Sequence, residues 1–432
     1  MQLSVANWAG NQRWMPHERA QPTSVGEVAT IVSGAHREGR RVKVIGGGHS
    51  FTATAATDGV QLRLDALDRV IAIDERRRRV RVGAGIKLHR LNDVLAEHGV
   101  AMPNLGDIDR QSLAGAIATA THGTGRHLGN LATTVVAMEM VSGTGDVVSC
   151  SEDVEPDLLR VARVGVGALG VVTEVTLQCV DAFNLHARET VEPIDDLLDR
   201  FDEHVAGSDH FEFFLMPGGR RAQVKRNDRT TEPARPPTRW GYLRDKVLAE
   251  NVGFGAVCRV GRRVPALAPR LAKLVTSAAA ERDVIDRSDR VFCSPRHVRF
   301  VEMEYGLPIE HVPAALRRVG ELAANLPTPV LFPIEVRVSA GDDIPLSTAF
   351  GRDSGWIAVH QYRGMPFEEY FDAVERIMDD YAGRPHWGKL HFQRAATLRD
   401  RYPQWDQFAL VRDRLDPDRT FANPYLDRVL GP

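Results

Sequence analysis

The feature that most constrains the fold is an apolar strand that runs directly into three glycines, between Val42 and Phe51 (VKVIGGGHSF). Alternating valines predict a β-strand, and successive glycines let the backbone approach a ligand closely. Free N–H groups in such a turn can hold phosphate oxygens. The segment has neither the GxxxxGK[ST] spacing of a Walker A loop nor the GxGxxG spacing of a dinucleotide fingerprint. By itself, a glycine-rich turn of this kind is also compatible with a simple tight turn.

Two further segments rich in small residues strengthen the prediction of a binding site. Gly106–Gly125 carries few bulky side chains after Ser112, and Gly165–Thr173 leads small residues into another predicted strand. A backbone without large side chains can lie flat against an extended ligand. The alternative for the second segment is a helix packed closely against a sheet. The three segments together favour a binding cavity built largely from backbone.

The pattern of predicted elements changes after Cys179. Short strands and helices alternate before it, whereas longer alternating strands and helical patterns follow it. This order predicts an α+β fold with an antiparallel sheet in its second part. The predicted helices there are Ile194–Val205, Val312–Leu326 and Pro366–Tyr381, and the predicted strands are Phe211–Leu215, Val298–Tyr305, Leu331–Val338 and Trp356–Tyr362. The stretch Thr230–Arg239, rich in Pro and Arg, predicts an exposed loop.

Length, charge and cysteine spacing exclude several classes of protein. A chain of 432 residues suffices for two or three structural units, and 43% hydrophobic residues indicate a globular core. The net charge of −2 provides no overall basic field for nucleic acid or an anionic membrane. No segment approaches the ~18 apolar residues of a membrane span. Four widely spaced cysteines without a CxxC pair predict neither a disulfide framework nor a metal site, and we expect a cytoplasmic protein.

Ionisable side chains stand on apolar backgrounds in the second half of the chain. Glu335 and Arg337 lie two residues apart in a predicted strand, so their side chains leave the same face about 7 Å apart. Their apolar neighbours indicate burial and hence a site, rather than a surface ion pair. Lys389 follows His386-Trp387-Gly388. Desolvation lowers the pKa of a lysine, which would let Lys389 act as a base; a contact at a helix end is the alternative.

Two further pairs share a strand face by the same spacing. They are His360 with Tyr362, and Glu302 with Glu304. The two glutamates are either supporting groups of a site or part of a solvated strand face.

All these motifs together resemble a known family. The PTS…GGGHSF, S-x-A-G-A-x-A-T-x-T-H-G-T-G and GALGVVTEVTL motifs are similar to the FAD-binding domain of vanillyl-alcohol-oxidase-type flavoproteins. FPIEVR, HQY and HWGK are similar to motifs of the sugar-1,4-lactone oxidases and the related alditol oxidases. The resemblance covers about Trp8 to Leu430. It implies an α+β fold in two domains: a PCMH-type FAD-binding domain over residues 1–180, and a substrate cap with an antiparallel sheet and flanking helices over residues 181–400. Residues 401–432 are expected to return to the FAD-binding domain.

The resemblance implies an FAD cofactor attached covalently through His49, although a lone histidine can also be a structural hydrogen-bonding group. The other residues that it places at the cofactor are Gly46, Gly47, Gly48, Ser50, Ser112, Gly115, Ala118, Thr119, His122, Gly123 and Val172. For His122 a packing role is an equal alternative.

The implied reaction is hydride transfer from a C–H beside a hydroxyl of a sugar 1,4-lactone to the flavin. Arg337 would polarise the substrate oxygen, and Glu335 would orient Arg337 and bind a sugar hydroxyl. Lys389 would manage the alcohol proton, and His360 would lie on the substrate side of the flavin. Electrons would then pass to O2 or to another acceptor, either a protein or a dye.

Three more residues bear on access and on the choice of substrate. The resemblance places Gly106 where a small residue leaves a path for O2, with Asp107 beside it. Tyr362 is bulkier than the matching residue of alditol oxidases, which favours a lactone over an open-chain alditol. An alditol oxidase with the same flavin machinery is the alternative, and a nucleotide- or flavin-binding module without redox activity is a third hypothesis.

Overall fold

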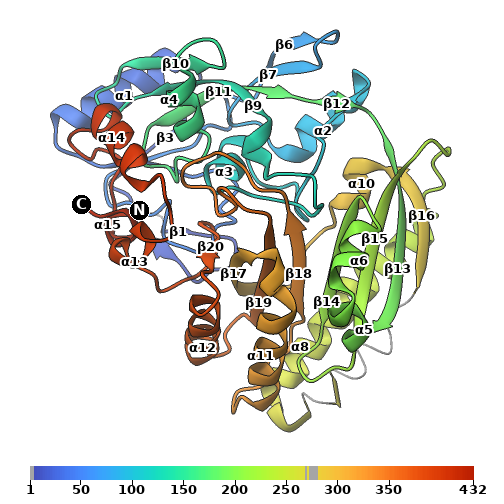
Figure 1. The fold of residues 1–432 in the computed structure, drawn as a ribbon. Helices are drawn as coiled ribbons and strands as arrows, with labels where there is room; N and C mark the ends of the chain where they lie inside the picture. The colour runs from blue at the N-terminus through green and yellow to red at the C-terminus, as the bar shows by residue number, and fades with distance from the viewer. Residues whose placement is uncertain (1–3, 268–269, 272–280) are drawn as a thin grey trace.

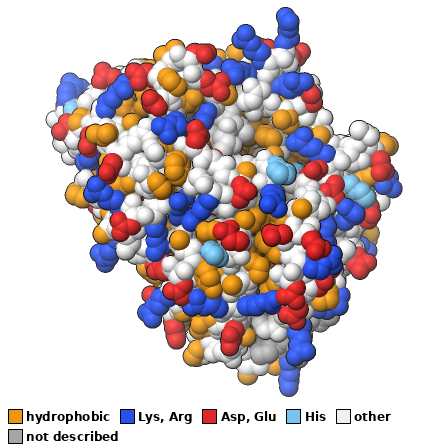
Figure 2. Space-filling model, in the orientation of Figure 1, with side chains coloured by type: hydrophobic (Ala, Val, Ile, Leu, Met, Phe, Trp, Pro, Cys, Tyr) orange, Lys and Arg blue, Asp and Glu red, His pale blue; other side chains and the backbone are white. Residues whose placement is uncertain are grey.

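The computed structural model describes residues 4–267, 270–271 and 281–432 (Figure 1). Small parallel and antiparallel sheets with helices build the first 180 residues, and one eight-stranded sheet dominates the rest. This mixture of helices with largely antiparallel sheets confirms the predicted α+β class. On the face shown in Figure 2, basic and acidic side chains are intermixed rather than gathered into one field.

A three-stranded parallel sheet positions the first glycine-rich segment. Its order is β3(Glu18–Ala20), β5(Val60–Leu62), β4(Val42–Val44). Helix α1(Val25–Arg37) connects β3 to β4, and the Ser24 hydroxyl caps it by accepting a hydrogen bond from the Glu27 N–H at 3.2 Å. The helix buries residues at the i, i+4, i+7 spacing of an amphipathic helix: Val28, Val32 and Ala35. The chain leaves β4 directly into the three glycines.

A five-stranded antiparallel sheet carries the third glycine-rich segment. Its order is β10(Val147–Ser151), β9(Val135–Val141), β11(Val171–Gln178), β7(Arg79–Gly83), β6(Val70–Asp74). The other elements of the first part are β1(Val5–Ala6), β2(Arg13–Trp14), β8(Val100–Ala101), β12(Val180–Asp181), α2(Leu88–Glu97), α3(Leu113–Ala118), the 3-10 turn Leu131–Thr134 and α4(Pro156–Ala162). Helix α3 lies within the second glycine-rich segment and β11 begins within the third, and residues of all three segments line one cavity.

The second part is an eight-stranded sheet with antiparallel neighbours throughout. Its order is β16(Arg282–Arg287), β13(Asn184–Pro193), β15(Arg221–Thr230), β14(His210–Leu215), β18(Ile334–Ser339), β19(Ser354–Tyr362), β17(Phe300–Pro308), β20(Arg384–Pro385). Helices α5(Ile194–Asp199), α6(Phe201–Ala206), α11(Val312–Asn325) and α12(Glu368–Asp379) flank it (Figure 1). These elements confirm the predicted helices and strands within a few residues. The one break falls at Arg200, whose ψ of 30° is not helical and divides the first predicted helix in two.

The end of the chain packs against the first part. Helices α13(Ala395–Arg399), α14(Trp405–Leu415) and α15(Pro424–Leu430) contribute Trp405, Phe408 and Leu426 to the core that also holds Val80 and Leu91. Residues before position 400, Leu346 and Trp387 among them, join the same core. The domain limits at residues 180 and 400 stay predictions.

A helical segment covers one end of the eight-stranded sheet. It consists of α7(Arg239–Tyr242), a π-helical stretch Leu243–Gly253 and α8(Phe254–Arg263), and α10(Ser288–Phe292) follows later. Residues 231–238 before it are all exposed and confirm the predicted loop. Among the described residues, no helix is both long and apolar enough to cross a membrane. All four cysteines carry free thiols.

Candidate active site

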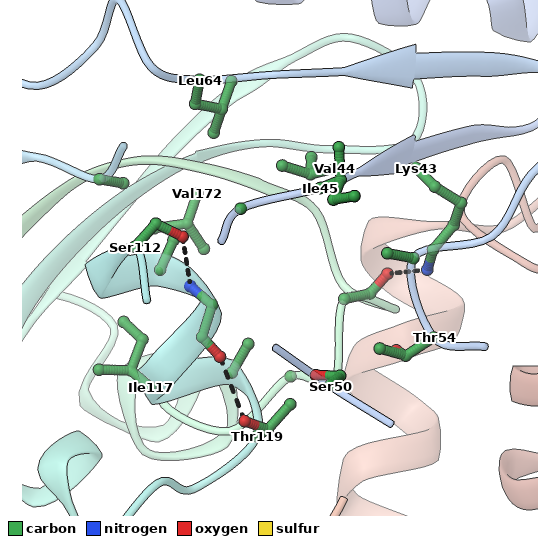
Figure 3. Close-up of a pocket in the computed structure, with 18 of the residues that line it drawn as sticks. Lys43, Val44, Ile45, Ser50, Thr54, Leu64, Ser112, Ile117, Thr119 and Val172 are labelled. Atoms are coloured by element: carbon green, nitrogen blue, oxygen red, sulfur yellow. Dashed lines mark hydrogen bonds between the residues drawn. The ribbon is translucent and has the colours of Figure 1, made fainter. Parts of the chain in front are cut away.

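A cavity opens where the three glycine-rich segments meet (Figure 3). It contains about 1320 Å³ of space between protein atoms, part of it open to solvent. The predicted cofactor residues that line it are Gly46, Gly47, Gly48, His49, Ser50, Ser112, Gly115, Ala118, Thr119 and Val172.

Five consecutive backbone N–H groups, from Gly46 to Ser50, have no hydrogen-bond partner among the described residues, and all five residues line the cavity. These residues are partly or fully exposed at the cavity wall rather than packed in the core, so their N–H groups are free to bind a ligand. Successive N–H groups form a concave site for anionic oxygens. The cavity therefore fits the diphosphate of FAD, with glycine and alanine backbone available to lie along the rest of the cofactor.

Gly46 has no room for a side chain because the first two glycine-rich segments touch there. A Cβ atom at Gly46 would lie 2.1 Å from the Ser112 Oγ. That hydroxyl caps α3 by accepting a hydrogen bond from the Gly115 N–H at 3.3 Å (Figure 3). A methyl group at position 46 would therefore displace both the cap and one wall of the cavity.

In a His49→Ala background, where no covalent bond can hold the flavin, Gly46→Ala is expected to weaken FAD retention about tenfold or more, because overpacking of this kind costs about 1–3 kcal/mol. The ratio of flavin absorbance to protein absorbance, followed during dialysis, measures it. Gly34→Ala is the matched control: nothing lies within 4 Å of a Cβ at this position in α1, so a gain of about 0.5–1 kcal/mol in stability is expected. Full retention of flavin by Gly46→Ala would contradict the steric argument.

A second group of residues, charged and mostly buried, lies on the central strands of the eight-stranded sheet. Arg337 of β18 forms ion pairs with Glu335 of the same strand, with Asp107, and with Glu212 of β14 at 3.0 Å. Glu335 and Arg337 thus share a face, as their spacing predicts. The Arg337 side chain is 8% exposed. Its burial lowers the pKa, but the surrounding carboxylates outweigh burial and hold the Arg337 pKa well above its ordinary value.

The carboxylates around Arg337 differ in their protonation. Burial raises the pKa of Glu335 to about 7, although Arg337 acts in the opposite direction. Asp107 is also buried, but Arg337 and Arg296 outweigh that burial and hold its pKa below the ordinary value. Near neutral pH, therefore, Asp107 is ionised while Glu335 can take up or release a proton.

Lys389 lies just after β20 and contacts two glutamates of β17. Its ammonium group forms an ion pair with Glu302, lies 3.9 Å from the Glu304 Oε2, and stands 5.4 Å from the centre of the Phe51 ring. Burial alone would lower the Lys389 pKa, but Glu302 and Glu304 outweigh it and raise the pKa. The expected lowering of this pKa is therefore wrong, and Lys389 is an ammonium ion. The two glutamates are buried supporting groups, not a solvated strand face.

His360 lies between the ion pairs of Arg337 and those of Lys389. Its Nδ1 lies 3.0 Å from the Pro333 carbonyl oxygen and so carries the hydrogen, which leaves Nε2 facing Glu302 at 3.5 Å and Glu335 at 3.9 Å. Tyr362 lies farther out: its ring stacks with Phe332, with 6.5 Å between ring centres. Its expected role at the substrate stays a prediction.

His122 and Gly123 lie outside the residues that line the cavity. The His122 ring stacks on Trp356, with 3.6 Å between ring centres. Its Nδ1 lies 2.9 Å from the Gly123 carbonyl oxygen, and its Nε2 lies 3.3 Å from the Glu304 Oε1. Both of the expected cofactor contacts stay predictions, and the structure shows a packing and ion-pairing role for His122.

Gly106 lies beside this site, and there is little free space where a side chain at this position would be. A Cβ atom there would meet the His122 carbonyl oxygen at 3.2 Å and the Thr121 Cγ2 at 3.3 Å. The Gly106 carbonyl oxygen accepts a hydrogen bond from the Cys293 Sγ at 3.4 Å. Its expected influence on O2 access stays a prediction.

Sequence reasoning missed Glu212 and Arg296. Glu212 is the one acidic residue of β14 (HFEFFL), and a lone carboxylate in an apolar strand is a signal that could have found it. Arg296, which pairs with Asp107, stands in no recognisable motif.

Two buried groups bring possible metal-ligand atoms within 4.8 Å of one another: His122-Glu304-His386 and Asp107-Glu212-Glu335. The second group already surrounds the Arg337 guanidinium. In the first, the His386 Nδ1 accepts a hydrogen bond from the Gly388 N–H at 3.0 Å. The His386 Nε2 therefore carries the hydrogen and has no lone pair for a metal.

Comparisons with known proteins agree with the fold and the cavity. Residues 16–151 match a family model described as an FAD binding domain. Cholesterol oxidase from B. sterolicum has the same fold: the TM-score is 0.85 at 18% sequence identity, over 100% of this chain and 97% of that one. The fold and the site define an FAD-dependent oxidoreductase of the vanillyl-alcohol-oxidase type.

A second family model, described as D-arabinono-1,4-lactone oxidase, matches residues 175–429. L-gulono-1,4-lactone dehydrogenase of Mycobacterium tuberculosis is 49% identical over 99% of both chains. L-gulonolactone oxidase of Scyliorhinus torazame is 35% identical over 99% of this chain and 98% of its own, and alditol oxidase of a Streptomyces species is 33% identical over the whole of both. The chain belongs to the D-arabinono-1,4-lactone oxidase family.

Proposed function

We propose that the protein oxidises a sugar 1,4-lactone of the gulono, galactono or arabinono type at a C–OH group. The observation that carries this proposal is a pair of cations held by carboxylates: Arg337, which is buried, and Lys389, which is partly buried and lies next to the cofactor cavity. The link to the cavity is direct, since the Phe51 N–H donates to the Gly388 carbonyl oxygen at 2.7 Å. Guanidinium and carboxylate groups make several directional hydrogen bonds and suit a polyhydroxylated substrate. The names of the relatives with 49% and 35% identity support a lactone.

The FAD, when bound, supplies the acceptor for the hydride that leaves the substrate carbon. Arg337 and Lys389 are both cations, so they would bind the reacting hydroxyl and stabilise the negative charge that develops on its oxygen. Glu335, with a pKa near neutrality, would accept the hydroxyl proton. Phe300 packs edge-to-face on His360 at 5.1 Å between ring centres and would help to exclude water from this side of the site.

The rate of flavin reduction by substrate is expected to rise about tenfold per pH unit up to about pH 7 and then to level off, because Glu335 must be ionised to accept a proton. Glu335→Gln should remove this pH dependence and slow reduction ~10²- to 10⁴-fold. Anaerobic stopped-flow absorbance over a range of pH measures both. Glu321→Gln, at an exposed position of α11, is the control and should keep the wild-type profile. An unchanged acid limb in Glu335→Gln would assign the proton to another group.

The covalent link is the finer part of the cofactor proposal: a bond between the His49 imidazole and the 8α-methyl carbon of the flavin. Burial, together with the charges of Lys389 and Lys87, lowers the pKa of His49 to about 4. The ring is therefore neutral at pH 7 and has a free lone pair for bond formation. Its position on the cavity wall supports the same role.

In the wild-type protein, the flavin is expected to stay with the acid-precipitated pellet. In His49→Ala it is expected to be released completely to the supernatant. Absorbance of the pellet and the supernatant after precipitation measures it. His17→Ala, at an exposed position, is the control and should leave the flavin in the pellet. Release of flavin from the wild-type protein under the same conditions would show that no covalent bond is present.

The proposed reaction is tested by an anaerobic screen of the purified yellow protein with lactones, xylitol and sorbitol, followed by O2 or cytochrome c. Bleaching of the flavin by a lactone alone is the expected result. Bleaching by xylitol or sorbitol alone would favour the alternative hypothesis of an alditol oxidase. The 33% identity to an alditol oxidase is the observation that supports this alternative. The second step identifies the acceptor. We propose the cytoplasm as the location, since the four free cysteines suit a reducing compartment.

A further inference from the structure

Helix α8 packs against the rest of the molecule through its smallest residues. Gly255, Cys258 and Gly261 are its buried positions. The approach is close: a Cβ atom at Gly261 would lie 2.7 Å from the Leu331 Cδ2. A helix that stabilises a core normally buries its large apolar side chains and exposes polar ones. In α8, by contrast, Val260 is 43% exposed, and Phe254 and Val257 are only partly buried.

The exposed apolar side chains of this segment form one continuous line, which we call the outer ridge. Leu248, Val252, Ala256, Val260 and Val264 follow one another at four-residue intervals, and Leu243 precedes them by five residues in the π-helical stretch. Both intervals place successive side chains on the same face of a helical stretch, and Val264 follows directly after the last residue of α8. The outer ridge is therefore Leu243, Leu248, Val252, Ala256, Val260 and Val264.

The exposure of the outer ridge is not the ordinary scatter of single apolar residues. Val252 is 55% exposed, and Trp240 just before the ridge is 66% exposed. Among the described residues, twelve large hydrophobic side chains are exposed, and six of them fall between residues 240 and 264. Contiguous exposed apolar surface of this kind marks a site of interaction with a partner or a membrane.

The charge of the same segment indicates which kind of partner it fits. Residues 239–264 contain six Arg or Lys and two Asp or Glu, a net charge of +4 in a chain whose overall net charge is −2. Arg259 and Arg263 are exposed next to the outer ridge. Aliphatic side chains and a Trp on a helical segment rich in Arg and Lys are typical of helices that lie in a membrane interface.

The segment also covers the substrate side of the molecule. Phe254 at the start of α8 packs edge-to-face on Phe332 with 4.9 Å between ring centres, and Phe332 in turn stacks on His360 at 6.0 Å. Figure 1 shows α8 at the end of the molecule opposite α1 and α4. A surface bound to the outer ridge would therefore lie over the substrate cap and leave the cofactor-binding end free.

We propose that the outer ridge docks the protein onto an anionic lipid surface. The apolar side chains would enter the headgroup region while the neighbouring arginines contact the lipid phosphates. A second copy of the chain fits less well, because two segments of net charge +4 would then face each other. The proposal is independent of the reaction assigned above. It places the substrate cap at the lipid surface.

The test is co-sedimentation of the flavin-loaded protein with vesicles of phosphatidylcholine mixed with phosphatidylglycerol, compared with vesicles of phosphatidylcholine alone. We expect at least ~tenfold stronger binding to the anionic vesicles, and a loss of binding at high salt. The double variant Leu248→Gln/Val252→Gln should lower binding at least ~tenfold. Its flavin absorbance and its reduction by substrate should stay unchanged, which shows that the variant has folded.

Leu410→Gln is the matched control, because Leu410 is 70% exposed on α14, outside this segment. It should bind vesicles as the wild-type protein does. Failure of the wild type to bind anionic vesicles would overturn the proposal, as would equal binding by the double variant. A lipid-free dimer in light scattering that the double variant abolishes would assign the outer ridge to a second copy instead, and so would also overturn it.

Discussion

Lys389→Met is expected to slow the reduction of the flavin by substrate about 10²- to 10³-fold. Removing one group that stabilises developing charge in an acyl-transfer enzyme costs about 2.7–4 kcal/mol, and we propose the equivalent role for Lys389. The substitution also leaves Glu302 buried without its cation. Lys389 is one of the groups that hold the Glu302 pKa at about 2 against the effect of burial, so this carboxyl should take up a proton more readily in the variant. Anaerobic stopped-flow absorbance measures the rate.

Lys389→Arg separates the two roles that a lysine can have in this position. An arginine keeps the positive charge but cannot act as a base. The ammonium that the structure shows therefore predicts partial recovery of the rate in Lys389→Arg. If the Arg variant were as slow as the Met variant, a base role would regain support. A Met variant that reduces its flavin at the wild-type rate would remove Lys389 from the reaction altogether.

Arg337→Met is expected to lower the free energy of unfolding by about 3 kcal/mol at about pH 8. Removing one partner of a buried ion pair costs about 3–5 kcal/mol, and the low end applies because Asp107 keeps Arg296 and Glu212 keeps Lys225. Urea unfolding measures the loss. Arg317→Met on the surface of α11, where Arg317 pairs with Asp199, is the control and should cost at most about 1 kcal/mol.

The loss in Arg337→Met should depend on pH in a defined direction. Without the guanidinium, the buried carboxyl of Glu335, whose pKa burial already raises to about 7, has a higher pKa in the folded variant than in the unfolded chain. The folded variant then binds more protons than the unfolded one, so its stability falls as the pH rises through this pKa. We expect a smaller deficit near pH 5 than near pH 8. An equal deficit at both would show that lost packing, rather than unpaired charge, is the cause.

The residues of the cofactor cavity were predictable because their constraint is local. Gly46 to Ser50 follow one another in the chain, and their unpaired N–H groups come from the course of five consecutive residues after a strand. Ser112 and Gly115 are likewise joined by one helix cap. His122 is the exception: its sequence neighbours suggest the cofactor, yet the sheet places Trp356 and Glu304 against its ring. Its partners come from distant strands, and no local pattern contains them.

The charged residues around Arg337 and Lys389 could be brought together only by the order of the strands in the sheet. The spacing of Glu335 and Arg337 shows that they share a face, but Glu212 joins them only because β14 pairs with β18. The neighbours of Lys389 are likewise set by the fold: Glu302 and Glu304 lie beside it because the Leu390 N–H donates a hydrogen bond to the Glu302 carbonyl oxygen. Those carboxylates reverse the pKa shift that burial alone would produce. A pKa depends on every charge nearby, so it cannot be deduced from one motif.

By itself the sequence determined the class of fold, the residues that line the cofactor cavity and the shared face of Glu335 and Arg337, because glycine spacing and strand alternation act over a few residues. Tertiary structure decided the charge of Lys389, the place of His122 and the outward direction of the outer ridge. From the sequence, apolar residues four apart in a helix indicate a buried face. Only the packing of Gly255 against Val298 and of Gly261 against Leu331 shows that this helix turns that face to the solvent.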